Sequence, residues 1–152
     1  MLLNQVRDWF GTGTIINLQP VIDLADIQPV DAYEVPAEMR DALYLRTPAS
    51  AFPYSNQTNR SMDIDHTIAY RRNPTPPGQT GMHNLGPLGR AEHRFKTHGR
   101  ITYRQPVPGT YLWRTLTGRV LLVNDTGTHD LGTNTFADTI WQAAEQRSPL
   151  VD

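Results

Sequence analysis

The chain has 152 residues, of which 38% are hydrophobic and 19% are charged, and it contains no cysteine. The length is enough for one domain with a real core or for two very small modules. The lack of cysteine excludes disulfides, iron–sulfur clusters, four-thiolate zinc sites and cysteine nucleophiles. We expect a soluble globular protein, because no apolar run is long enough to cross a membrane as a helix. We expect no secretory signal at the N-terminus, which favours the cytoplasm.

Charge is distributed unevenly along the chain. Residues 1–59 carry three basic and seven acidic side chains, a net charge of −4. Residues 60–119 carry ten basic and three acidic side chains, a net charge of +7, and residues 120–152 return to −4. A basic middle between acidic flanks indicates a surface for a polyanion. A solvated basic face without a ligand would give the same pattern.

The N-terminal third contains signals for short elements. Apolar residues at helical spacing predict a helix over residues 2–10, and β-type runs follow at 14–18 and 21–24. Pro36 suits the first turn of a further helix, because proline is tolerated where the backbone N–H has no partner. We expect that helix to end before Pro48.

The middle of the chain predicts a strand, a loop, an extended piece and a helix. A polar loop over residues 49–61 leads into the alternating run Asp63–Tyr70, which is typical of a strand with one buried face. Three prolines make residues 73–81 an irregular loop. A short extended piece over residues 84–88 comes next. Residues 90–98 contain good helix formers, and Gly99 is suited to end that helix.

The C-terminal third predicts a β-meander followed by a helix. We expect strands at 101–104, 110–115 and 119–123, because glycine-containing turns separate these runs. Within the second strand, Tyr111 and Trp113 are assigned to the core rather than to a surface that stacks on nucleic-acid bases. Apolar spacing between Phe136 and Ala144 predicts a final short helix.

Four polar residues of the middle segment suggest hydrolytic chemistry. Asp65 and His66 are adjacent on the predicted strand, Asn84 follows the loop, and His93 lies on the predicted helix. Neighbouring strand residues point to opposite faces, so at a strand end the pair could serve different partners of one site. Asp65 could hold a divalent cation with His93, since Mg²⁺ needs only one or two protein ligands. His66 could take a proton from water near neutral pH.

These residues resemble the motif of HNH endonucleases, which have a ββα-metal fold. The wider context resembles the C-terminal nuclease segment of actinobacterial HNH proteins that carry a long helical N-terminal domain. The matching stretches are Tyr33–Pro36, Leu45-Arg46, Phe52-Pro53, Asp63–Ile68, Asn84-Leu85, Pro87-Leu88, Arg90, His93-Arg94, Lys96–Gly99, Tyr111–Trp113 and Gly118-Arg119. The resemblance therefore covers most of the chain.

The resemblance implies a role for each matched residue. His66 would be the general base, Asp65 and His93 would bind a single divalent cation, and Asn84 would fix the loop that positions the base. The basic residues of the helix would lie near the DNA backbone, namely Arg90, Arg94, Lys96 and His98. For His98, the alternative is a simple cation at the helix C-terminus. Mg²⁺ is the expected cation, with Mn²⁺, Ni²⁺ and Zn²⁺ as the other candidates.

The chain departs from the resembled family at four positions. Relatives usually hold a structural zinc with four cysteines, and the corresponding positions here are Ser50, Ser55, Met62 and Gly89. We therefore expect no structural zinc, and packing must supply the folding energy that the metal would contribute. Glu92 also stands where relatives often carry histidine.

Together these observations predict an α+β protein with a ββα-metal nuclease core. The expected organisation is a short N-terminal extension over residues 1–48, a nuclease-like domain over 49–131 and a tail with a short helix over 132–152. The expected function is metal-dependent cleavage of DNA, with no membrane partner. A catalytically inactive DNA-binding remnant and a purely structural remnant are the alternatives. The sequence does not indicate the oligomeric state.

Overall fold

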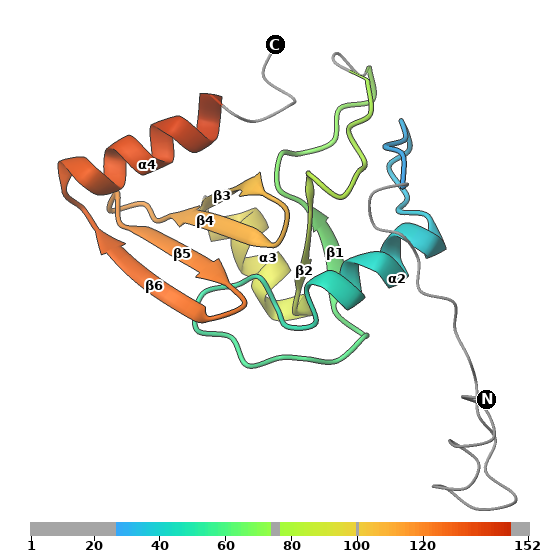
Figure 1. Ribbon diagram of the computed structural model, residues 1–152, viewed down its shortest axis with the longest axis horizontal. Coiled ribbons are helices and arrows are strands. Elements are labelled where there is room, and N and C mark those ends of the chain that lie inside the picture. Colours follow the sequence, from blue (N-terminus) through green and yellow to red (C-terminus); the bar gives the residue numbers. More distant parts are fainter. Residues whose placement is uncertain (1–26, 74–76, 100, 147–152) are drawn as a thin grey trace, which may run out of the picture.

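The computed structural model describes residues 27–73, 77–99 and 101–146 of the chain. Within these ranges the protein forms three α-helices and two antiparallel sheets, which is an α+β arrangement (Figure 1). The helix predicted over residues 2–10 and the β-type runs predicted at 14–18 and 21–24 lie outside the described residues.

A two-stranded hairpin stands at the centre of the molecule. β1 (Asp63–His66) pairs antiparallel with β2 (Leu85–Leu88), and α3 (Arg90–Gly99) begins two residues after β2 ends. The predicted strand, extended piece and helix are thus confirmed as elements. The expectation that β1 continues to Tyr70 is wrong, because the chain leaves the ladder after His66.

The second sheet is a meander of four strands in chain order. These are β3 (Thr102–Val107), β4 (Thr110–Arg114), β5 (Val120–Asn124) and β6 (Gly127–Gly132). The first three were predicted from the sequence, but β6 was not. Its residues are mostly polar or glycine, and it lies at the edge of the sheet, where alternation between a core and a solvent face is weak.

The two faces of this sheet pack against different partners. α4 (Thr135–Gln146) covers one face and buries Trp141 against Leu112 and Val120. Tyr111 and Trp113 point to the other face, as alternation along β4 requires, and they pack toward the hairpin. Their assignment to the core is confirmed. No helix in the described ranges is long and apolar enough to span a membrane.

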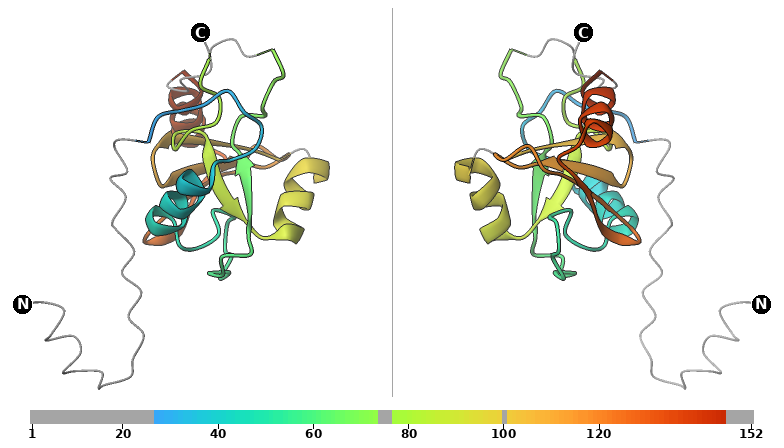
Figure 2. Two further views of the ribbon diagram at one scale, coloured as in Figure 1. Left: turned by 90° about the vertical axis from the view of Figure 1, so that its right-hand side faces the viewer. Right: turned by 90° about the vertical axis from the view of Figure 1, so that its left-hand side faces the viewer.

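The hairpin lies between two helices. α2 (Ala37–Arg46) begins after Pro36 and packs Leu43 against Leu85 of β2, while α3 lies beside β1 on the other side (Figure 2). The guanidinium of Arg46 donates to the carbonyl of Met82 at 2.8 Å, which ties the end of α2 to the chain entering β2. The sheet, both helices and the hairpin thus hold the last residues of β1 in a fixed place.

Candidate active site

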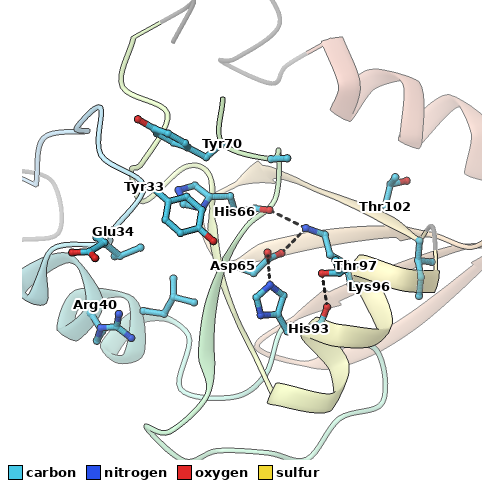
Figure 3. Close-up of a pocket in the computed structure, with 14 residues that line it drawn as sticks. Tyr33, Glu34, Arg40, Asp65, His66, Tyr70, His93, Lys96, Thr97 and Thr102 are labelled. Carbon is cyan, nitrogen blue, oxygen red and sulfur yellow. Dashed lines mark hydrogen bonds and ion pairs between the residues drawn. The ribbon is translucent and has the colours of Figure 1, made fainter. Parts of the chain in front are cut away.

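Four of the predicted site residues line one hollow of about 860 Å³ at the end of β1, namely Asp65, His66, His93 and Lys96 (Figure 3). Asp65 and His66 are each 7% exposed, and His93 reaches them from α3. Since successive strand residues point to opposite faces, Asp65 faces α3 and the second sheet, whereas His66 faces the loop that joins β1 to β2. The hairpin therefore gives the carboxylate and the imidazole separate partners within one site.

The carboxylate of Asp65 has three partners. Its Oδ1 atom lies 3.1 Å from Nε2 of His93. Its Oδ2 atom accepts hydrogen bonds from Nζ of Lys96 at 2.8 Å and from the hydroxyl of Tyr103 at 2.9 Å. Burial, and after it the charge of Asp65, raises the pKa of Tyr103 well above its ordinary value. Tyr103 therefore remains a donor that fixes this carboxylate.

The imidazole of His93 lies between two aspartates of β1. Its Nδ1 atom is 3.1 Å from Oδ2 of Asp63, and its Nε2 atom faces Asp65. The guanidinium of Arg90 lies 3.1 Å from the other oxygen of Asp63. Sequence analysis gave Asp63 no separate role, although its place two residues before Asp65 puts both side chains on the same face of the strand. That spacing was the signal that could have revealed it.

The loop between the strands fixes the tautomer of His66. Its Nε2 atom lies 2.7 Å from Oγ1 of Thr80, and that hydroxyl donates its hydrogen to the carbonyl of Ala32. A threonine hydroxyl has one hydrogen, so Thr80 must accept a hydrogen bond from Nε2 of His66. The Nδ1 atom then keeps its lone pair, and the sequence gave no indication of this arrangement.

Burial lowers the pKa of His66 below its ordinary value. The charge of Asp65 opposes this shift, and the charge of Lys96 adds to it. Because the shift moves the pKa downward from about 6.5, the imidazole is neutral at pH 7. A neutral imidazole with a free lone pair can accept a proton from water.

Asn84 anchors the loop rather than lining the hollow. Its side chain is almost fully buried, and its Oδ1 atom accepts from the hydroxyl of Thr67 at 2.6 Å and from the N–H of Ile68 at 2.8 Å. Its Nδ2 atom donates to the carbonyls of Ile68 at 3.0 Å and Gln79 at 2.9 Å. These bonds draw the chain out of β1 after His66, which is why the strand is shorter than its sequence pattern predicts.

The four residues of α3 that we expected near the DNA backbone differ in their exposure and partners. Arg94 and His98 are exposed on the helix, and Arg90 is exposed but paired with Asp63. Lys96 is only 16% exposed and points into the site, where it also donates to the carbonyl of His66 at 3.2 Å. The helix thus presents some cations to solvent and turns one inward.

Two of the four positions expected to correspond to zinc-binding cysteines, Ser50 and Gly89, share one hydrogen-bond acceptor, the carboxylate of Glu92. The hydroxyl of Ser50 donates to Oε2 of Glu92 at 2.5 Å, and the N–H of Gly89 donates to the same oxygen at 2.7 Å. The side chain of Gln57 fills the space beside Gly89, where an added Cβ would lie 2.1 Å from its Oε1. The carboxylate of Glu92 therefore links the loop that contains Ser50 to the start of α3.

Two tyrosines flank His66. Tyr33 stacks on the imidazole with ring centroids 5.9 Å apart and planes 22° apart, and the Tyr70 ring lies 5.7 Å away. Both line the hollow, where Figure 3 shows Tyr33 directly over His66. Sequence analysis missed both as site residues, because neither their spacing nor their surroundings distinguish them from other aromatic side chains.

No family model, no curated protein and no solved structure matches the chain. Among the residues that the structure describes, no group of three or more histidine, aspartate or glutamate side chains is arranged to hold a metal ion. The case for the chemistry of this site therefore rests on its own residues and geometry.

Proposed function

We propose that this protein is a metal-dependent endonuclease of the HNH type that hydrolyses phosphodiester bonds in DNA. The observation that supports the proposal is the convergence of Asp65, His66 and His93 on one hollow, brought about by a hairpin followed by a helix. The ββα order of these elements is the order that the resembled family uses.

The chemistry of the donor atoms suits a hard divalent cation, held by Asp65 and His93. Ligands of an octahedral ion at about 2.1 Å lie about 3.0 Å apart when they are neighbours, and the two donor atoms here are 3.1 Å apart. A neutral imidazole carries one hydrogen, yet both ring nitrogens of His93 face carboxylate oxygens. A cation at Nε2 would satisfy that side of the ring. When bound, Mg²⁺, or Mn²⁺, Ni²⁺ or Zn²⁺ in its place, would stabilise the negative charge that develops on the phosphate oxygens.

His66 would act as the general base. A water molecule loses its proton to Nδ1 while its oxygen forms a bond to phosphorus, and the bond from phosphorus to the leaving oxygen breaks. Thr80 keeps the proton on Nε2, so the accepting nitrogen is available in the resting protein. Asn84 would hold the loop that carries Thr80, through its bond to the carbonyl of Gln79.

A second candidate function is DNA binding without cleavage. It is favoured by one observation: Asp65 already has a complete set of partners in His93, Lys96 and Tyr103. A carboxylate so fully compensated does not need a metal ion for its electrostatic balance.

Relaxation of supercoiled plasmid separates the two candidates. The wild-type protein is incubated with Mg²⁺, Mn²⁺, Ni²⁺ or EDTA, beside His66→Ala and a matched control, His129→Ala. His129 lies on the edge strand β6, and among the described residues its side chain has one hydrogen bond, with the nearby Thr126. Nicking by the wild type and the control, lost in His66→Ala and in EDTA, supports the nuclease. Salt-sensitive DNA binding without cutting under any cation would support the binding module, and neither cutting nor binding would refute both.

A further inference from the structure

Tyr33 is an exposed ring held at a fixed place beside the site. Its exposed fraction is 71%, although it stacks on the nearly buried His66. Val30 exchanges backbone hydrogen bonds of 2.8 and 3.0 Å with Thr80, and the Ala32 carbonyl accepts from the Thr80 hydroxyl. The backbone on the N-terminal side of Tyr33 is thus anchored to the loop that orients His66. Because so much of the ring is exposed, packing in the core does not explain why the ring lies there.

The rings around His66 leave one face of Tyr33 open. Tyr70 lies beside Tyr33 in a T-shaped pair, with centroids 5.8 Å apart and planes 71° apart, and Tyr33 is still 71% exposed. His66 occupies the inner face. The outer face therefore offers a flat aromatic surface next to the atoms that would carry out hydrolysis.

The surroundings of this surface fit a nucleotide. Every nucleobase has a π-face, and stacking on tyrosine is how proteins bind single strands without reading their sequence. Arg71 and Arg72 follow Tyr70 directly and are exposed, so they place positive charge beside the rings. In a duplex each base is already stacked between its neighbours, and only an unpaired base can lie on a protein ring.

We propose that Tyr33 is a stacking platform for an unpaired nucleobase next to the phosphate that is cut, which makes single-stranded or locally unpaired DNA the favoured substrate. This inference rests on the proposed nuclease function. It extends that function by naming the class of DNA and by giving a role to Tyr33, to which the HNH resemblance assigns none.

The platform can be tested by binding alone, in EDTA, so that cleavage is not needed. The probe is a single-stranded oligonucleotide with 2-aminopurine at its centre, whose fluorescence falls when that base stacks, compared with the same sequence as a duplex. We expect the wild type to bind the single strand more tightly and to quench its fluorescence. Tyr33→Ala should lose about tenfold in single-strand affinity, the lower part of the range for one stacked base, and should lose the quenching.

Three comparisons keep the test specific. Tyr33→Phe keeps the ring and should bind like the wild type, and Tyr54→Ala removes an equally exposed tyrosine elsewhere and should also bind like it. Duplex affinity should be unchanged in Tyr33→Ala. Equal single-strand affinity in Tyr33→Ala and the wild type, or equal losses for both DNA forms, would overturn the platform. If binding depends on Tyr33 but the wild type cuts neither plasmid nor single-stranded DNA with any of the cations, the platform stands and the nuclease proposal fails.

Discussion

The hydroxyl of Thr80 decides which nitrogen of His66 carries hydrogen. The Thr80 oxygen accepts a hydrogen bond from Nε2 of His66, 2.7 Å away, because the hydrogen of the Thr80 hydroxyl is donated to the carbonyl of Ala32. Thr80 lies 14 residues after His66, beyond a proline-rich loop, so no periodicity in the sequence connects the two. The sequence pattern suggests His66 as a candidate base, and only the folded loop shows how its imidazole is oriented.

Substitution of Thr80 by valine should slow cleavage while leaving DNA binding intact. Valine has nearly the same shape but cannot accept a hydrogen bond, so His66 would be free to place its proton on Nδ1. We expect the rate of DNA cleavage to fall by about tenfold to a hundredfold, which is a smaller loss than removal of the general base would cause. Thr80→Ser should restore most of the rate, because serine keeps the hydroxyl.

Nitrogen NMR of the imidazole gives a reading that does not depend on cleavage. In the wild type, Nε2 of His66 should carry the proton, and in Thr80→Val the two tautomers should be mixed. An unchanged tautomer in Thr80→Val, or a Thr80→Ser protein as slow as Thr80→Val, would show that the hydroxyl does not position the base.

At the scale of elements, sequence pattern predicts helices and paired strands better than it predicts where they stop. The alternation of Asp63–Tyr70 predicts one strand, yet β1 ends at His66. The cause is Asn84, which accepts from the hydroxyl of Thr67, 17 residues away, and from the backbone of Ile68. Alternation reports only which residues could face a core, and a distant buried amide can still redirect the chain.

The same reasoning explains which parts of the site were predictable. Asp65, His66 and His93 were predicted to lie together because their residue types and spacing resemble a known motif, and all three line the hollow. Tyr103 was not, since it reaches Asp65 from a separate sheet, 38 residues away. Gly86 lies opposite Asp65 in the hairpin, and an added Cβ there would come within 3.2 Å of the Tyr103 hydroxyl. Contacts between distant elements depend on how the elements pack, and a single sequence does not show that packing.

Removal of the Glu92 carboxylate should destabilise the start of α3. Glu92→Ala leaves the Ser50 hydroxyl and the Gly89 N–H without their common acceptor. We expect the free energy of unfolding to fall by about 1–3 kcal/mol, the cost of leaving buried polar groups without partners. Urea denaturation followed by circular dichroism measures the change.

The matched control is Glu145→Ala. Its carboxylate is half-exposed and lies 3.9 Å from the Arg104 guanidinium, so the loss should stay below about 1 kcal/mol. If both variants lose the same stability, then the Glu92 carboxylate does not link the loop to the start of α3.

At the scale of the whole molecule, the acidic flanks neutralise part of the basic middle. Four arginines of residues 60–119 pair with acidic residues outside that segment: Arg60 with Asp41, Arg104 with Glu145, Arg114 with Asp138 and Arg119 with Asp130. The net charge of +7 read from the sequence is therefore not one continuous surface. Within the described residues, Arg71, Arg72 and Arg94 are exposed and have no ion pair, which leaves positive charge on the loop after β1 and on α3.

This distribution predicts which arginines contribute to DNA binding. A cation that contacts phosphate displaces counterions, so its removal lowers the slope of log affinity against log salt by about one. Arg94 is exposed on α3, the helix that also carries His93, whereas Arg119 is paired with Asp130 on the edge of the second sheet. We therefore expect Arg94→Ala to reduce the slope by about one and Arg119→Ala to leave it unchanged, measured by fluorescence anisotropy in EDTA. Equal slopes for the two variants would mean that Arg94 does not contact the DNA backbone, and the proposed contact between α3 and DNA would be wrong.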